Sequence, residues 1–235
     1  MRDRRTALAP LDRHAHIRVM DALSSPLQVI FAARGGRDAK SRCAAALSPD
    51  AREALAECLL RDVLDSAQDR DVWLVTPTPQ LADIAGAAGA HVIVERTGDG
   101  LNGAYAQALA HIGYDEPRVL MPSDLAYLSA ADFEESEVAL RTADVAIAPT
   151  QHGGTGAIFL RAGLTFEPMF GANSFARHVD QARTAGLRLV ILETPGLTRD
   201  VDWVEDLATL ASERPDSHTG AFARAWLAAT AAPAR

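Results

Sequence analysis

Lysine is almost absent from this chain of 235 residues, because 22 of its 23 basic residues are arginine and only Lys40 is lysine. Heavy arginine usage commonly follows genome composition, so the single lysine is the informative position. Cysteine is also scarce. Two cysteines, Cys43 and Cys58, are too few to stabilise a fold of this size by disulfide bonds, and their spacing is not that of metal ligands. We therefore expect a protein of the reducing cytoplasm.

Long apolar runs and an excess of positive charge are missing as well. No run approaches the roughly 20 apolar residues that a membrane-spanning helix needs. The formal net charge is −8, whereas a general nucleic-acid binder or a protein bound to an anionic membrane needs a basic face. We expect neither nucleic acid nor membrane as a partner. The content of 48% hydrophobic and 23% charged residues is that of an ordinary globular chain.

Short apolar runs alternate with helical patterns, which is typical of an α/β sheet with crossover helices. We predict a single domain with a mostly parallel central sheet and helices on both faces. It covers residues 27–212, between a poorly ordered N-terminal extension (1–26) and a C-terminal helical tail (213–235). The predicted strands are 27–33, 72–76, 91–95, 118–121, 144–149, 157–161 and 188–193, and the helices are 48–66, 78–89, 101–112, one from 129, 174–186 and 204–210.

The loop after the first strand carries most of the local positive charge. It reads Arg34-Gly-Gly-Arg-Asp-Ala-Lys40-Ser-Arg42, and ligands of such sheets bind where strands end. Its two glycines let backbone N–H groups face an anion, and its cations can neutralise a triphosphate. The spacing is not that of a P-loop, and a solvated basic turn is the alternative interpretation.

A second loop, Gly98-Asp-Gly-Leu-Asn-Gly103, matches the dinucleotide fingerprint G-x-G-x-x-G, and Asp124 lies near the spacing of its acid. An NAD(P)-dependent oxidoreductase is therefore one hypothesis. Against it, the motif follows the third strand rather than the first. A glycine-rich turn beside some other nucleotide fits the position better.

Three carboxylates follow strands in the last two-thirds of the chain. Asp124 comes after the fourth strand, while Asp200 and Asp202 project to the same side of an extended segment. Asp124 as a helix cap is the alternative, but Ser129 already fills that place in a capping box with Asp132. Together the three acids predict an oxygen cage for Mg²⁺.

A region for a second substrate is predicted where Thr155 lies in a glycine turn and Ser174 begins a helix. A helix N-terminus binds anions, although Ser174 can equally be a plain N-cap. His152 can donate a hydrogen bond to substrate. We expect His178, one turn into the helix, to be structural.

These segments resemble the CofC/FbiD guanylyltransferases of coenzyme F-420 biosynthesis, which have the GT-A-like (Rossmann-like) nucleotidyltransferase fold. The likeness covers about Leu27 to Leu210. Its motifs are Ala-Lys-Ser-Arg (39–42), Leu-Ser-Pro-Asp (47–50), Leu-Arg-Asp-Val-Leu (60–64), Gly-Leu-Asn (100–102), Pro-Ser-Asp-Leu (122–125), His-Gly-Gly-Thr (152–155), Phe-Gly-x-x-Ser-Phe-Ala-Arg-His (170–178) and Asp-Val-Asp (200–202).

The resemblance implies transfer of GMP from GTP to a small phosphorylated acid, with release of pyrophosphate. It implies Mg²⁺ on Asp124, Asp200 and Asp202, and catalytic roles for Lys40, Arg42 and Asp124. It also implies a downstream flavin-handling transferase as a partner, because the product is labile. The implied GTP-binding residues are Ala32, Ala33, Arg34, Lys40, Arg42, Pro77, Gly100, Asn102, Pro122 and Ser123, and the implied acceptor-binding residues are His152, Thr155, Gly171 and Ser174.

Three departures from the family pattern cluster where the acceptor would bind. Ala32-Ala33-Arg34 replaces Pro-Val-Lys, Gly156 replaces an asparagine, and Ala126-Tyr127-Leu128 replaces Pro-Leu-Leu. The added donor His152 and the lost amide favour 3-phospho-D-glycerate slightly over 2-phospho-L-lactate and phosphoenolpyruvate. One alternative is a molybdenum-cofactor guanylyltransferase, which has a longer first loop that residues 31–42 match only in part. Another is an inactive nucleotide-binding regulator.

Overall fold

The structure is a computed structural model that describes residues 25–36, 39–96 and 98–231. Nearly all of the predicted N-terminal extension lies outside these residues. The strands are β1 (Gln28–Ala32), β2 (Asp71–Thr76), β3 (His91–Val94), β4 (Arg118–Pro122), β5 (Val145–Pro149), β6 (Thr155–Leu160) and β7 (Leu189–Ile191). The helices are η1 (Ser41–Cys43), α2 (Pro49–Ser66), α3 (Pro79–Ala87), α4 (Gly100–Ile112), α5 (Ala130–Leu140), α6 (Ser174–Thr184), α7 (Pro195–Thr198), α8 (Val204–Glu213) and α9 (His218–Ala231).

The seven strands form one sheet in the order β3-β2-β1-β4-β6-β5-β7. All neighbouring pairs are parallel except those of β6, which runs antiparallel to β4 and β5. The central strands are buried on both faces, which is why they read as continuous apolar runs. The predicted α/β fold with a mostly parallel sheet is confirmed.

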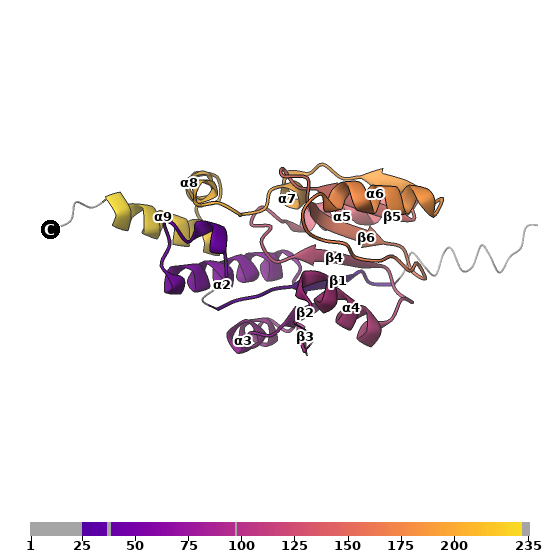
Figure 1. Ribbon diagram of the computed structural model, residues 1–235, viewed down its shortest axis with the longest axis horizontal. Helices are drawn as coiled ribbons and strands as arrows, with labels where there is room; N and C mark the ends of the chain where they lie inside the picture. The colour runs from indigo at the N-terminus through magenta and orange to yellow at the C-terminus, as the bar shows by residue number, and fades with distance from the viewer. Residues whose placement is uncertain (1–24, 37–38, 97, 232–235) are drawn as a thin grey trace, which may run out of the picture.

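Alternate residues of β1 point into two different cores. Val29 and Phe31 belong to the core under α2, α3 and α5, whereas Ile30 belongs to the core under α4 and α6. Side chains of a strand alternate between its faces, so one short apolar strand serves both layers. Helices therefore cover both faces of the sheet (Figure 1).

The C-terminal helix α9 packs against α8 and α2 (Figure 1). The Asp62 carboxylate of α2 accepts hydrogen bonds from the backbone N–H groups of His218 (2.7 Å) and Thr219 (2.9 Å) at the start of α9. A buried carboxylate thus satisfies N–H groups that the first turn of a helix leaves unpaired. Within the part of the chain that the structure describes, no helix combines the length and apolarity that crossing a membrane requires.

Candidate active site

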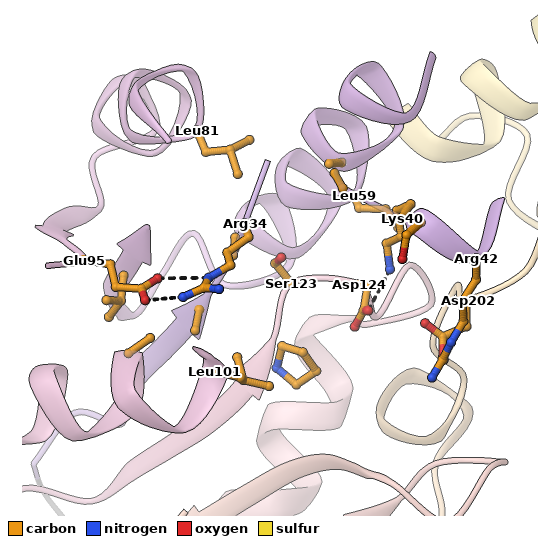
Figure 2. Close-up of a pocket in the computed structure, with 18 residues that line it drawn as sticks. Arg34, Lys40, Arg42, Leu59, Leu81, Glu95, Leu101, Ser123, Asp124 and Asp202 are labelled. Atoms are coloured by element: carbon orange, nitrogen blue, oxygen red, sulfur yellow. Dashed lines mark hydrogen bonds and ion pairs between the residues drawn. The ribbon is translucent and has the colours of Figure 1, made fainter. Parts of the chain in front are cut away.

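A cleft of about 460 Å³ opens at the carboxyl ends of β1 and β4. The walls come from the loop after β1 and from α2, α3 and α4 (Figure 2). The structure brings together at this cleft seven of the predicted GTP-binding residues and two of the predicted metal ligands: Ala32, Ala33, Arg34, Lys40, Arg42, Pro122 and Ser123, with Asp124 and Asp202.

Three predicted GTP-binding residues, Pro77, Gly100 and Asn102, are not among the residues that line the cleft. Asn102 is fully engaged elsewhere: its side-chain amide donates to the Phe170 carbonyl (3.1 Å), and its Oδ1 accepts from the Phe170 N–H (2.7 Å). Its contact with GTP stays a prediction, and in this structure both ends of the amide hold the loop before α6.

The single lysine ties three distant segments together. Lys40 Nζ donates to Asp124 Oδ2 and to the Val201 carbonyl, both at 2.7 Å, and its side chain is 13% exposed. The Val201 N–H in turn donates to the Asp124 carbonyl at 3.1 Å. A compact ammonium with three donors can serve two acceptors in so narrow a place, whereas the planar guanidinium of arginine is larger.

Arg42 makes the second cationic contact of the cleft. It pairs with Asp202, and its guanidinium lies 5.7 Å from the centre of the Trp203 ring. The segment of Asp202 is itself fixed, because the N–H groups of Asp202 and Trp203 both donate to Asp206 Oδ2 at the start of α8 (2.9 and 2.8 Å). Two cations of one loop therefore face two carboxylates of two other loops.

The three aspartates lie close enough to influence each other's charge. Burial, together with the nearby Asp124 and Asp202 carboxylates, raises the pKa of Asp200 to about 6. Among residues 25–36, 39–96 and 98–231, however, no three ligating side chains form a cluster that could hold a metal ion. Mg²⁺ on Asp124, Asp200 and Asp202 stays a prediction, and in this structure Lys40 and Arg42 each hold one of these carboxylates.

Glu95 is a cleft residue that the sequence prediction missed. Both of its carboxylate oxygens accept from Arg34, with 3.2 Å between Arg34 Nε and Glu95 Oε2. The Glu95 side chain is only 2% exposed, whereas that of Arg34 is 48% exposed. Its position directly after β3 could have indicated a cleft residue, because ligand-binding loops follow strand ends. The sequence prediction placed Glu95 within the strand instead.

Thr155, Ser174 and His178 form a buried hydrogen-bonded chain. The Met169 N–H donates to His178 Nε2 at 2.7 Å, so the proton of the neutral ring is on Nδ1 and is donated to Thr155 Oγ1, 2.9 Å away. The Thr155 and Ser174 hydroxyls are 2.9 Å apart. Burial lowers the pKa of His178 to about 4, which keeps the ring neutral. The structural role expected of His178 is confirmed.

Direct binding of the acceptor by Thr155 and Ser174 stays a prediction, and in this structure the two hydroxyls bond to each other rather than line the cleft. Both side chains are buried, and neither lines the cleft. Ser174 is also not the N-cap, which is Asn173. The N–H groups of Ser174 and Phe175 donate to the carbonyls of Gly171 and Gly153, so these two amides at the start of α6 are not free for an anion. His152 and Gly171 are exposed but also lie outside the cleft lining.

Gly156 has a steric role. A Cβ atom at this position would lie 1.8 Å from the backbone carbonyl oxygen of Leu197 in α7. The asparagine that the family pattern has here therefore does not fit unless α7 moves. This departure of the sequence lets α7 lie directly against β6.

Comparison with known proteins identifies the family. The family model "Guanylyl transferase CofC like" matches residues 27–230. This chain belongs to the CofC-like guanylyl transferase family. It is thus a nucleotidyltransferase, and the family match favours neither the oxidoreductase nor the molybdenum-cofactor alternative.

Curated relatives in this family differ in the acid that their names specify. The chain is 43% identical over 194 residues to a 3-phospho-D-glycerate guanylyltransferase of Phenylobacterium zucineum, covering 78% of this chain and 89% of that protein. It is 38% identical to a phosphoenolpyruvate guanylyltransferase of Sphaerobacter thermophilus (75% and 88% covered). It is 32% identical to a 2-phospho-L-lactate guanylyltransferase of Methanothermobacter thermautotrophicus (79% and 84% covered).

Solved structures agree on the fold. A candidate nucleotide-diphospho-sugar transferase from Desulfovibrio desulfuricans G20 superposes with a TM-score of 0.70 at 22% identity, covering 87% of this chain and 96% of that one. A nucleotidyl transferase from Methanothermobacter has a TM-score of 0.56 at 14% identity, covering 79% and 95%. The predicted GT-A-like nucleotidyltransferase fold is confirmed.

Proposed function

We propose that this protein transfers GMP from GTP to 3-phospho-D-glycerate and releases pyrophosphate. The observation that carries the proposal is the facing arrangement of Lys40 and Arg42 with Asp124 and Asp202 in one cleft. Phosphoryl-type transfer depends mainly on positioning and charge neutralisation, and this cleft offers both kinds of charge from three separate loops.

The reaction joins two phosphate groups. An oxygen of the acceptor phosphate attacks the α-phosphorus of GTP, a new P–O bond forms, and the bond from the α-phosphorus to the bridging oxygen of the β-phosphate breaks. Pyrophosphate departs with the bonding electrons. Because a phosphate monoester is ionised near neutral pH, no general base is needed. Lys40 and Arg42 exchange their carboxylate partners for triphosphate oxygens and stabilise the departing pyrophosphate.

The carboxylates fit a divalent cation as cofactor. Asp124 Oδ1 is buried without a hydrogen-bond partner, and Asp200 lies beside two further carboxylates, which a cation would relieve. Asp124, Asp200 and Asp202 would hold Mg²⁺ once Lys40 and Arg42 turn to the triphosphate. The ion would supply charge neutralisation at the phosphate oxygens.

Two considerations support 3-phospho-D-glycerate as the acceptor. A relative that is 43% identical carries that name, and the exposed His152 offers a donor for an additional hydroxyl. Gly171 is the other exposed residue of the proposed acceptor side, while Thr155 and Ser174 hold the loops in place from within. The product would serve coenzyme F-420 biosynthesis in the cytoplasm, handed to a flavin-handling transferase because such a diphosphate ester is labile.

Product analysis tests the proposal directly. The purified protein is incubated with GTP and Mg²⁺ and, in separate reactions, with 3-phospho-D-glycerate, phosphoenolpyruvate and 2-phospho-L-lactate, and the products are identified by mass. We expect the guanylylated phosphoglycerate and an equal amount of pyrophosphate. Preference for either other acid would overturn the choice of acceptor, and no guanylylated product with any acid would overturn the proposed reaction.

A further inference from the structure

Glu95 lies at the end of the cleft opposite the aspartates. Figure 2 shows Arg34 and Glu95 at one end and Lys40, Asp124 and Asp202 at the other. The reaction as proposed uses the second end for phosphates and leaves the carboxylate of Glu95 without a role. A buried acid needs a partner, which Arg34 supplies here, but the half-exposed arginine is a partner that a ligand can replace.

The surroundings of Glu95 suit a flat heterocycle. Leu81 of α3 and Leu101 of α4 stand on either side of the Arg34–Glu95 pair, and Val75 and Ala104 also line the cleft. Cofactor sites commonly combine apolar walls with a few polar groups that fix orientation. With the triphosphate near Lys40 and Arg42, the base of the nucleotide is directed toward this apolar end.

The backbone around Glu95 is held on both sides. The Glu95 N–H donates to the Thr76 carbonyl at 3.0 Å. The Gln107 side chain of α4 donates to the Val94 carbonyl (2.8 Å) and accepts from the Arg96 N–H (3.1 Å). These contacts fix the backbone that carries the carboxylate before any ligand binds. Such preorganisation favours recognition of a base.

We propose that Glu95 recognises guanine, accepting hydrogen bonds from the base N1–H and the N2 amino group. The inference rests on the proposed use of GTP. A carboxylate only accepts, and guanine presents two adjacent donors on this edge, whereas adenine presents an acceptor at N1 and has no amino group at C2. Arg34 occupies both carboxylate oxygens in the structure, and since its side chain is half exposed it can turn away when the base arrives.

A change of donor specificity tests this assignment. Glu95→Gln replaces one acceptor with a donor, which suits xanthine, whose C2 carries a carbonyl oxygen instead of the amino group. We expect kcat/KM for GTP to fall roughly tenfold to a hundredfold, as for loss of a bidentate base contact, and the ratio of XTP to GTP use to rise at least as much. The wild-type protein should use ITP, which lacks the N2 amino group, less well than GTP.

Arg34→Gln is the matched control. If Glu95 only anchors Arg34, the two variants will lower the use of GTP, ITP and XTP by the same factor, and the assignment is overturned. If Glu95→Gln does not fold, as judged by circular dichroism, Glu95→Asp replaces it. That variant keeps both acceptors, so it should retain the preference for GTP over XTP while losing kcat/KM, and equal use of the two would contradict the proposal. A wild-type protein inactive with GTP would instead refute the proposed reaction.

Discussion

The cleft and the region around the start of α6 both gather polar side chains from loops, but they use them differently. In the cleft, Lys40 and Arg42 form ion pairs with carboxylates from distant loops, and these groups keep contact with solvent. Near α6, the hydroxyls of Thr155 and Ser174 and the His178 ring are buried and bonded to one another. Partly exposed ion pairs can exchange partners at small cost, whereas buried hydrogen bonds are expensive to leave unmade. We therefore propose that ligands bind in the cleft and that the buried hydrogen bonds near α6 stabilise the fold.

The largest expected effect is the loss of activity in Asp124→Asn. Removing one preorganised charge from such a site lowers kcat by about a hundredfold or more, while the isosteric side chain should leave the fold intact. Steady-state release of pyrophosphate measures kcat, and circular dichroism checks the fold. Asp83→Asn, at an exposed position on α3, is the control. Turnover of Asp124→Asn near that of the control would show that the cleft carboxylates are not catalytic.

Beside the α6 region, in β6, Gly156→Ala should lower stability strongly without changing any residue of the cleft. The new methyl group would overlap the Leu197 carbonyl oxygen, so α7 must move, at a cost of about 2–4 kcal/mol. Urea denaturation measures the change in the free energy of unfolding. Gly86→Ala, in α3 with no atom within 4 Å of the new methyl group, should be neutral or stabilising by up to about 1 kcal/mol. Equal stability of the two variants would mean that the contact with α7 is not tight.

The buried histidine predicts a pH dependence. The pKa of His178 is about 4 in the fold against 6.5 for the free side chain, so between these values the unfolded chain binds a proton that the folded chain does not. The contribution of the neutral ring to the free energy of unfolding is therefore fully present above pH 6.5 and is lost as the pH falls toward 4. His178→Gln should lower stability by about 1–3 kcal/mol at pH 7.5 and reduce the slope of stability between pH 4 and 6.5.

Urea denaturation at several pH values measures this slope, and the KM for GTP is the control. Because His178 does not line the cleft, that KM should change by less than about twofold. An unchanged pH slope would contradict the neutral, buried state of the ring. A large rise in the KM for GTP would contradict the separation of the two regions.

The smallest expected effect is on stability in Asp200→Asn. The pKa of Asp200 is raised from 3.8 to about 6, so its stability contribution is present below pH 3.8 and is lost as the pH rises through about 6. A neutral amide should therefore raise the melting temperature at pH 8 by a few degrees when no divalent cation is present. Thermal denaturation in EDTA measures it, and an equal or lower melting temperature would show that the carboxylates do not repel each other.

Local sequence patterns were sufficient to predict most of the strands and helices of the fold. The strand predicted at 27–33 is β1 (Gln28–Ala32), and the predicted capping box is present, since the Ser129 N–H donates to Asp132 Oδ2 at 2.9 Å. Lys40 could be singled out by composition alone. These features depend on hydrophobic periodicity and on contacts between residues near each other in the chain, which are readable without coordinates.

The use of each polar side chain was decided by tertiary structure. Asn102 and Thr155 lie in motifs that match a nucleotidyltransferase, yet one holds the Phe170 loop and the other bonds to His178. Glu95, outside every motif, lines the cleft with Arg34. Composition and periodicity determined which segments become strands and helices. Which side chains stay accessible depended on how segments 61 to 161 residues apart pack, because burial and hydrogen bonding are settled only by those contacts.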